Sequence, residues 1–149
     1  MHKDSVNLTG ALQIAINGEI VEEINNLVVT AGKDWVASRM QGVTDAVMSH
    51  MAIGTGTTAA AAGDTTLETE SARVALTVAG GVVSTNTITF TCTFAADVPD
   101  VTAPATAPIT EAGVFNAASS GTMCARTVFP VINKGESDTM TITWVITIS

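Results

Sequence analysis

The stretch Met140-Thr-Ile-Thr-Trp-Val-Ile-Thr-Ile148 decides the fold class. Large apolar side chains occupy its even positions, and threonine or valine occupies the odd ones. Strict alternation with period 2 over a stretch of this length predicts a β-strand with one buried face and one more polar face. Threonine is β-branched and favours strands, while it keeps a hydroxyl for solvent or for a neighbour.

A second stretch, Thr87-Ile-Thr-Phe-Thr-Cys-Thr-Phe94, repeats the pattern, with its apolar residues on one face and four threonines on the other. Further short apolar runs predict strands at 49–53, 109–115 and 123–129. The sequence therefore predicts a mainly all-β protein, a single β-sandwich of jelly-roll-like type. The residues expected in its core are Trp35, Ile88, Phe90, Phe94, Phe115, Phe129, Ile142, Trp144 and Ile146.

The N-terminal residues predict a β-hairpin followed by the one convincing helix. Apolar residues alternate before Asn17-Gly18, a dipeptide typical of tight hairpin turns, and the chain returns over residues 20–29. A helical spacing of apolar residues predicts a short helix near 31–41, with Gly42 placed to end it. We expect residues 1–29 to form a hairpin arm and residues 30–149 to form the sandwich, as one compact domain overall.

Composition narrows the function classes. The chain has 149 residues, 13% of them charged, and a net charge of −8, so no basic patch for nucleic acid is expected. No stretch approaches the roughly 20 apolar residues of a membrane span. Cys92 and Cys124 fall inside predicted strands, where they are either two buried thiols or a cross-strand disulfide; the sequence leaves both open.

Motifs for catalysis or ligands are weak. The run Gly54-Thr-Gly-Thr-Thr-Ala59 lacks the third glycine and the following helix of a dinucleotide loop. Asp64, Glu68 and Glu70 form either a calcium-binding cluster or a solvated acidic face. No nucleophile elbow is found. We therefore expect no catalytic, cofactor-binding or metal-binding residue, and a protein that is not an enzyme.

Glu111 is the exception among the charged residues. It lies in Ile109-Thr-Glu-Ala-Gly-Val-Phe115, on the strand face that Ile109, Gly113 and Phe115 share. A carboxylate on an inward face is costly unless it is paired. Arg126, on the next strand, is the expected partner in a structural Glu111–Arg126 pair. The alternative is that this strand face is exposed to solvent and the Glu111 carboxylate is solvated.

The order of several motifs resembles a known family. They are Val29-Thr-Ala-Gly-Lys-Asp-Trp35, Met51-Ala-Ile-Gly-Thr-Gly56, Thr66-Leu-Glu-Thr-Glu-Ser-Ala-Arg73, Ile109-Thr-Glu-Ala-Gly-Val-Phe115, Ala125-Arg-Thr-Val-Phe129, Lys134 and Ile142-Thr-Trp-Val-Ile146. Over about residues 28–148, the chain resembles bacteriophage virion proteins of the tail-collar-fibre type and the small phage decoration proteins that share their pattern. The resemblance implies a β-sandwich without catalysis that assembles as a homo-oligomer, expected to be a trimer, in a virion made in the bacterial host cytoplasm.

Because the chain has no shaft or receptor-binding tip after the sandwich, we expect a capsid decoration (cement) protein that binds the major capsid protein at capsomer junctions. One alternative is a tail, collar, baseplate or tail-fibre adaptor of the same fold, with tail or collar proteins as partners. Another is a carbohydrate-binding module for host attachment. Neither nucleic acid nor a membrane is an expected partner. The expected interface residues are Leu12, Ile14, Ile16, Ile20, Thr55, Thr57, Thr58, Asp97 and Asp100.

Overall fold

The computed structural model describes residues 3–43 and 45–149. Within these ranges the chain forms one helix and nine strands, which confirms the all-β class with one short helix. The elements are β1 (Leu8–Ile16), β2 (Glu19–Val28), α1 (Thr30–Met40), β3 (His50–Gly54), β4 (Glu70–Ala75), β5 (Val82–Ser84), β6 (Thr87–Phe94), β7 (Thr106–Phe115), β8 (Met123–Gly135) and β9 (Met140–Ile148).

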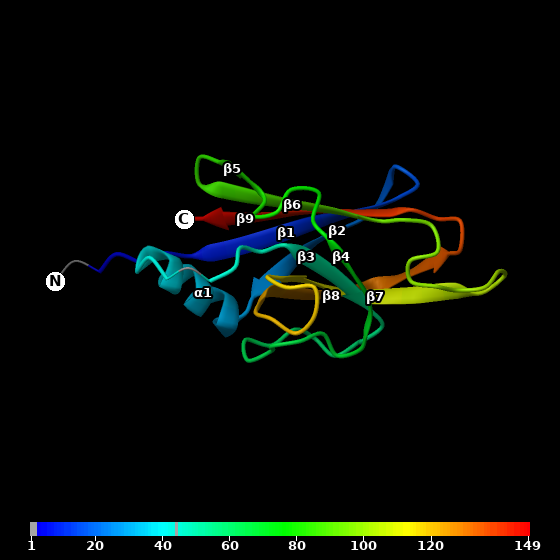
Figure 1. Cartoon of the computed structure of the whole chain (residues 1–149), viewed down its shortest axis with the longest axis horizontal. Helices are drawn as coiled ribbons and strands as arrows, with labels where there is room; N and C mark the ends of the chain where they lie inside the picture. Colours follow the sequence, from blue (N-terminus) through cyan, green and yellow to red (C-terminus); the bar gives the residue numbers. More distant parts are fainter. Residues whose placement is uncertain (1–2, 44) are drawn as a thin grey trace.

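The strands form one antiparallel sheet in the order β4-β3-β7-β8-β2-β1-β9-β6-β5. The sheet curls over, so that a layer of β5, β6, β9 and β1 faces a layer of β4, β3, β7 and β8 (Figure 1). Strand β2 joins the layers, because it pairs with β1 along most of its length and with β8 through Leu27 and Val28. The two edges approach each other where the Thr77 N–H donates to the Thr91 carbonyl over 2.8 Å.

The N-terminal hairpin is built into this sheet rather than added beside it as an arm. Its turn has positive φ at Asn17 and Gly18, as the dipeptide predicted. Strand β1 pairs with β9 from Leu8 to Ile16, and β2 supplies the connection between the layers. Residues 1 and 2 of the expected arm lie outside the described ranges. Removing residues 1–29 would therefore take two inner strands out of the sheet.

The core between the layers holds most of the expected residues. Trp144, Phe90, Phe94, Ile142, Ile146 and Phe129 are all buried there, and Phe115 is buried in a second, smaller cluster. Trp35 and Ile88 are only half-buried, which corrects their assignment to the core interior. Both line a cavity of about 300 Å³ that opens between α1 and β6 at one end of the molecule, so one side of each remains accessible.

Helix α1 packs closely against β8. A Cβ at Gly32 would lie 2.2 Å from the Cys124 carbonyl oxygen, so only glycine permits this approach. The helix ends where expected: Gly42 has φ +83° and donates to the Arg39 carbonyl, while Val43 N–H reaches the Ser38 carbonyl. This pair of bonds is a Schellman motif, and it satisfies carbonyls that the helix end leaves open.

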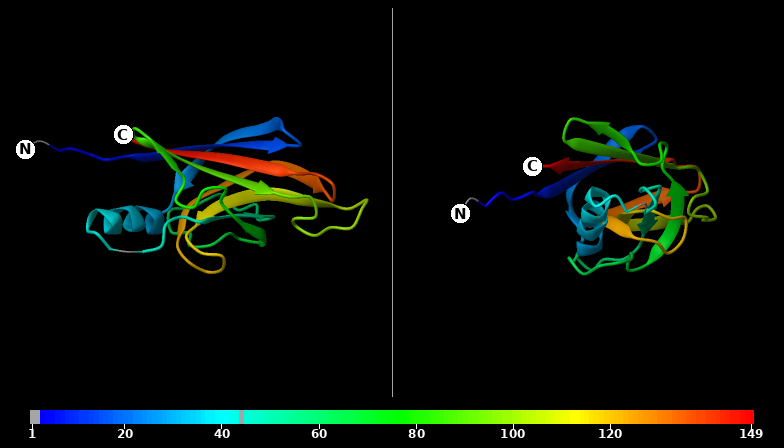
Figure 2. Two further views of the ribbon diagram at one scale, coloured as in Figure 1. Left: turned by 45° about the horizontal axis from the view of Figure 1, so that its top comes forward. Right: turned by 60° about the vertical axis from the view of Figure 1, so that its left-hand side comes forward.

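Both ends of the chain lie at the same end of the molecule as α1 and β5, and the N-terminal segment points away from the body (Figures 1 and 2). Over the described residues, no helix has the length and apolar character needed to cross a membrane.

Candidate functional site

The loop of residues 55–69 covers the outer face of β7 and β3. Leu67 from this loop packs with Val29, Ala52, Phe115 and Met123 in the second apolar cluster. Strand β7 is therefore buried on both faces, against the main core on one side and under the loop on the other. The loop thus lies across the chain's own sheet.

Glu111 holds this loop from below. The carboxylate is fully buried and accepts hydrogen bonds from the backbone N–H groups of Gly56 (3.0 Å), Thr69 (2.8 Å) and Glu68 (3.0 Å). A Cβ at Gly54 or Gly56 would lie 2.6 Å from Glu111 Oε1. The two glycines of the Met51–Gly56 run therefore let the backbone approach the carboxylate.

Arg126 completes the arrangement, which we call the Glu111–Arg126 node. Its Nη2 lies 2.8 Å from Glu111 Oε2, and its Nε donates to the same oxygen over 3.1 Å. Its Nη1 donates to Asp64 Oδ2 over 2.8 Å, and its Nη2 also donates to the Thr58 carbonyl over 3.0 Å. The structure thus brings the expected pair together and adds a second carboxylate, that of Asp64.

The pKa shifts of Arg126, Asp64 and Glu68 each favour the charged form of the side chain. Burial alone would lower the pKa of Arg126, but its bonds to Glu111 and Asp64 raise the pKa instead. The Ala61 N–H, followed by Arg126, lowers the pKa of Asp64. The Thr58 backbone N–H and hydroxyl lower the pKa of Glu68. The buried ion pair, with its remaining hydrogen bonds satisfied, therefore stabilises one conformation of the 55–69 loop.

The expectation that Ile109 and Glu111 share a strand face is wrong. The β7–β8 register shifts between Ile109 and Glu111, which is a β-bulge or a similar irregularity. Ile109 consequently packs in the main core, whereas Glu111 faces the loop on the other side. A bulge re-aims the side chains that follow it, and periodicity alone does not reveal it.

The expected interface residues differ in burial, and some of them lie in the core. Leu12 and Ile14 are buried in the main core, which corrects their assignment to an interface, and Ile16 is half-buried against that core. Their alternation marked the inner face of β1, because β1 is an internal strand with β9 and β2 on either side. The exposed members of the set are Ile20, Thr57, Thr58, Asp97 and Asp100, with Thr55 half-buried.

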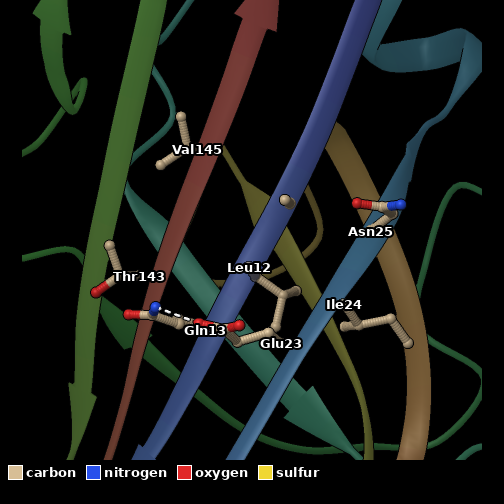
Figure 3. Close-up of a pocket in the computed structure, with 8 residues that line it drawn as sticks. Leu12, Gln13, Glu23, Ile24, Asn25, Thr143 and Val145 are labelled. Atoms are coloured by element: carbon tan, nitrogen blue, oxygen red, sulfur yellow. Dashed lines mark hydrogen bonds between the residues drawn. The ribbon is translucent and has the colours of Figure 1, made fainter. Parts of the chain in front are cut away.

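The outer surface of the first layer is nearly uncharged. We call it the threonine face and define it as Thr87, Thr89, Thr91 and Thr93 of β6, Thr141, Thr143, Val145 and Thr147 of β9, Ala11, Gln13 and Ala15 of β1, and Glu23 and Asn25 of β2. Glu23 is its one ionisable side chain and accepts a hydrogen bond from Gln13 over 2.6 Å (Figure 3). A shallow groove of about 630 Å³ runs between Thr143, Val145 and Asn25 on this face.

The acidic cluster does not assemble as a unit. Asp64 and Glu68 lie toward Arg126, at 2.8 and 4.0 Å, whereas Glu70 pairs with Arg73 at 2.7 Å. In the described part of the chain, no group of three or more histidine, cysteine or acidic side chains is placed to hold a metal. Cys92 and Cys124 are both buried free thiols, and burial raises the pKa of each to about 12.

Two polar contacts had no clear signal in the sequence. Lys134 is 1% exposed, and its Nζ donates to the Ala95 carbonyl over 2.9 Å beneath the 95–105 loop; burial lowers its pKa. Asn26 Oδ1 accepts from Trp144 Nε1 over 2.9 Å, above Gly10. The one hint in the sequence to the Lys134–Ala95 contact is the unusual position of a lysine among strand residues.

Comparisons of the chain with protein families, with curated proteins and with solved structures find no match.

Proposed function

We propose that this chain is a structural protein of a bacteriophage virion, that it decorates the capsid shell, and that it contacts the shell through the threonine face. The observation that supports this contact is that three neighbouring strands, β6, β9 and β1, contain no charged residue, so that Glu23 of β2 is the one ionisable side chain of the face. Charged residues are depleted at the centres of protein interfaces, because each would have to be desolvated there. Threonine hydroxyls and apolar methyl groups carry a much smaller desolvation cost.

The size of the face fits one contact. Four strands about 4.8 Å apart and about eight residues long, at about 3.3 Å per residue, give a projected area of roughly 500 Å². One partner in a standard interface buries roughly 800 Å². The rim would therefore contribute as well, and Ile20 of β2, which is 54% exposed and pairs with Ala15 of the face, is one apolar residue there.

The Glu111–Arg126 node lies on the other layer, away from the threonine face, and its proposed role is structural. It ties the 55–69 loop to β7 and β8 through three backbone N–H groups, one arginine and Asp64. The proposal assigns the node no catalytic step.

The test is binding of the purified chain to particles that lack it. Thr143→Lys and Thr91→Lys place a charge at paired positions in the middle of the face. Each should weaken binding roughly tenfold or more, because an unpaired ammonium would be buried in the interface. Thr57→Lys is the comparison, since it makes the same change on the 55–69 loop. Loss of binding in Thr57→Lys alone would move the contact to that loop and refute the proposed face.

A further inference from the structure

The threonine face carries one negative charge and no positive one. Its four strands contain no lysine or arginine, and their acidic residues are the three glutamates of β2. Successive side chains of a strand point to opposite faces. Glu23 therefore lies on the threonine face, whereas its neighbour Glu22, which pairs with the core residue Ile14, lies on the other face of β2.

The Glu23 carboxylate is held over the interior of the face. Glu23 pairs with Gln13 of β1, and Gln13 pairs in turn with Thr143 of β9. Figure 3 shows the Glu23 side chain extending from β2 over β1, where Gln13 Nε2 donates to its Oε1 over 2.6 Å. The charge thus belongs to the surface that the proposed contact would cover.

The second oxygen of Glu23 remains available. Among the described residues, only Gln13 donates to this carboxylate, and no lysine or arginine forms an ion pair with it. A neutral amide orients a carboxylate but does not cancel its charge. Oε2 can therefore accept a bond from a group that approaches the face.

The groove beside Glu23 suits a long basic side chain. Glu23 lines this groove of about 630 Å³ together with Ala11, Val145, Asn25 and Thr143. Lysine and arginine combine an apolar stem with a charged head. The stem fits against Ala11 and Val145, and the head fits beside Glu23. No set of three metal-ligating side chains occurs in the described ranges, so the cation expected here is carried by a partner.

We propose that the shell protein presents a lysine or arginine to Glu23, and that this ion pair fixes the register of the contact. The inference rests on the proposed function and names the partner chemistry that this contact requires. Once the face is covered, the carboxylate loses its water, and a charge without a partner is strongly unfavourable there. The threonine rows resemble one another, so neutral contacts alone would fit several registers, and a single ion pair distinguishes between them.

The test is binding of Glu23→Gln to particles that lack the chain, measured over a range of salt concentrations. Glutamine keeps the size of the side chain and an acceptor for Gln13, but it removes the charge. Binding should weaken roughly tenfold or more, because the partner's cation would be buried without a counter-ion. Added salt should weaken wild-type binding, and it should weaken Glu23→Gln binding less.

Glu22→Gln is the matched control. It makes the same change in net charge one residue away, on the opposite face of β2, and should bind as the wild type does. Because Glu23 is exposed, urea unfolding of Glu23→Gln should match that of the wild type, which separates weaker binding from a folding defect.

The outcomes distinguish this inference from the proposed function. If Thr91→Lys weakens binding and Glu23→Gln does not at any salt concentration, the ion pair is overturned and the threonine face remains the contact. Equal losses in Glu23→Gln and Glu22→Gln also overturn the ion pair, since they would report net charge alone. A wild-type chain that does not bind the particles refutes the proposed function, and the ion pair with it.

Discussion

Replacing Glu111 by glutamine should remove about 3 kcal/mol of stability while it keeps the shape of the side chain. Oε1 accepts from the N–H groups of Gly56 and Thr69, and Oε2 accepts from the Glu68 N–H and from Nε and Nη2 of Arg126. A glutamine has one acceptor oxygen and one NH₂ group. In either orientation, at least two donors would therefore face another donor.

The expected loss of about 3 kcal/mol combines two effects, the lost hydrogen bonds to the carboxylate and the broken ion pair with Arg126. A hydrogen bond to a charged acceptor contributes about 1.5–3 kcal/mol, and loss of one partner of a buried ion pair costs about 3–5 kcal/mol. These overlap, since Arg126 belongs to both, and Asp64 at 2.8 Å still compensates its charge. The lower end of the range is therefore expected, against a total stability of about 5–15 kcal/mol.

Urea unfolding followed by circular dichroism measures this loss, with the slope m unchanged. Glu70→Gln is the control: the Glu70 side chain is 34% exposed, and although its partner Arg73 is only 7% exposed, Arg73 keeps hydrogen bonds to the Ala117 and Ser120 carbonyls. The loss should therefore be about 1 kcal/mol, well below that of Glu111→Gln. Hydrogen exchange at the amides of Gly56, Glu68 and Thr69 should accelerate in Glu111→Gln. Equal, small losses in both variants would refute the node as the element that holds the loop.

Three further predictions concern other parts of the chain. Gly32→Ala should destabilise the protein by about 1–3 kcal/mol in thermal unfolding, because the new Cβ would lie 2.2 Å from the Cys124 carbonyl oxygen. This cost outweighs the better helix propensity of alanine. Gly63→Ala is the control and should be neutral, since a Cβ at Gly63 would have no atom within 4 Å. Asp64 has a lowered folded-state pKa, so its contribution to stability is fully present above its ordinary pKa of 3.8 and is lost as the pH falls through the folded-state pKa. In unfolding experiments across this pH range, Asp64→Asn should therefore lose less stability on acidification than the wild type. Lys134 has a folded-state pKa below 10.5, so its own contribution to stability rises as the pH increases toward 10.5. The buried Cys92 and Cys124 act in the opposite direction above about pH 9, so the quantity to measure is a difference: the stability of the wild type relative to Lys134→Met should increase as the pH rises toward 10.5.

The sequence predicted the strands well where one face is buried and the other is wet. The alternation in β9 and β6 predicted the correct inner face, although Ile88 is half-buried and Ile148 is exposed, and Asn17-Gly18 predicted the hairpin turn. The same alternation did not say what lies beside a strand. Leu12 and Ile14 were therefore expected at an interface, although the pairing of β1 with β9 and β2 places them in the core.

The contact between Glu111 and Arg126 could be predicted from the sequence, but the loop and the Asp64 carboxylate around it could not. A carboxylate and an arginine on neighbouring apolar strands indicated that Glu111 and Arg126 meet, because neither is stable alone when buried. The bulge that turns Glu111 away from Ile109, and the loop that brings Asp64 to Arg126, depend on contacts between residues far apart in the chain. No periodicity in the sequence carries that information.

The copy number of the chain in purified virions tests the central claim most directly. It is measured by quantitative mass spectrometry and normalised to the major capsid protein. A shell decoration protein should approach the abundance of the shell subunit. A handful of copies per particle would contradict that role and place the protein at the tail or collar, and its absence from virions would contradict the proposed function as a whole.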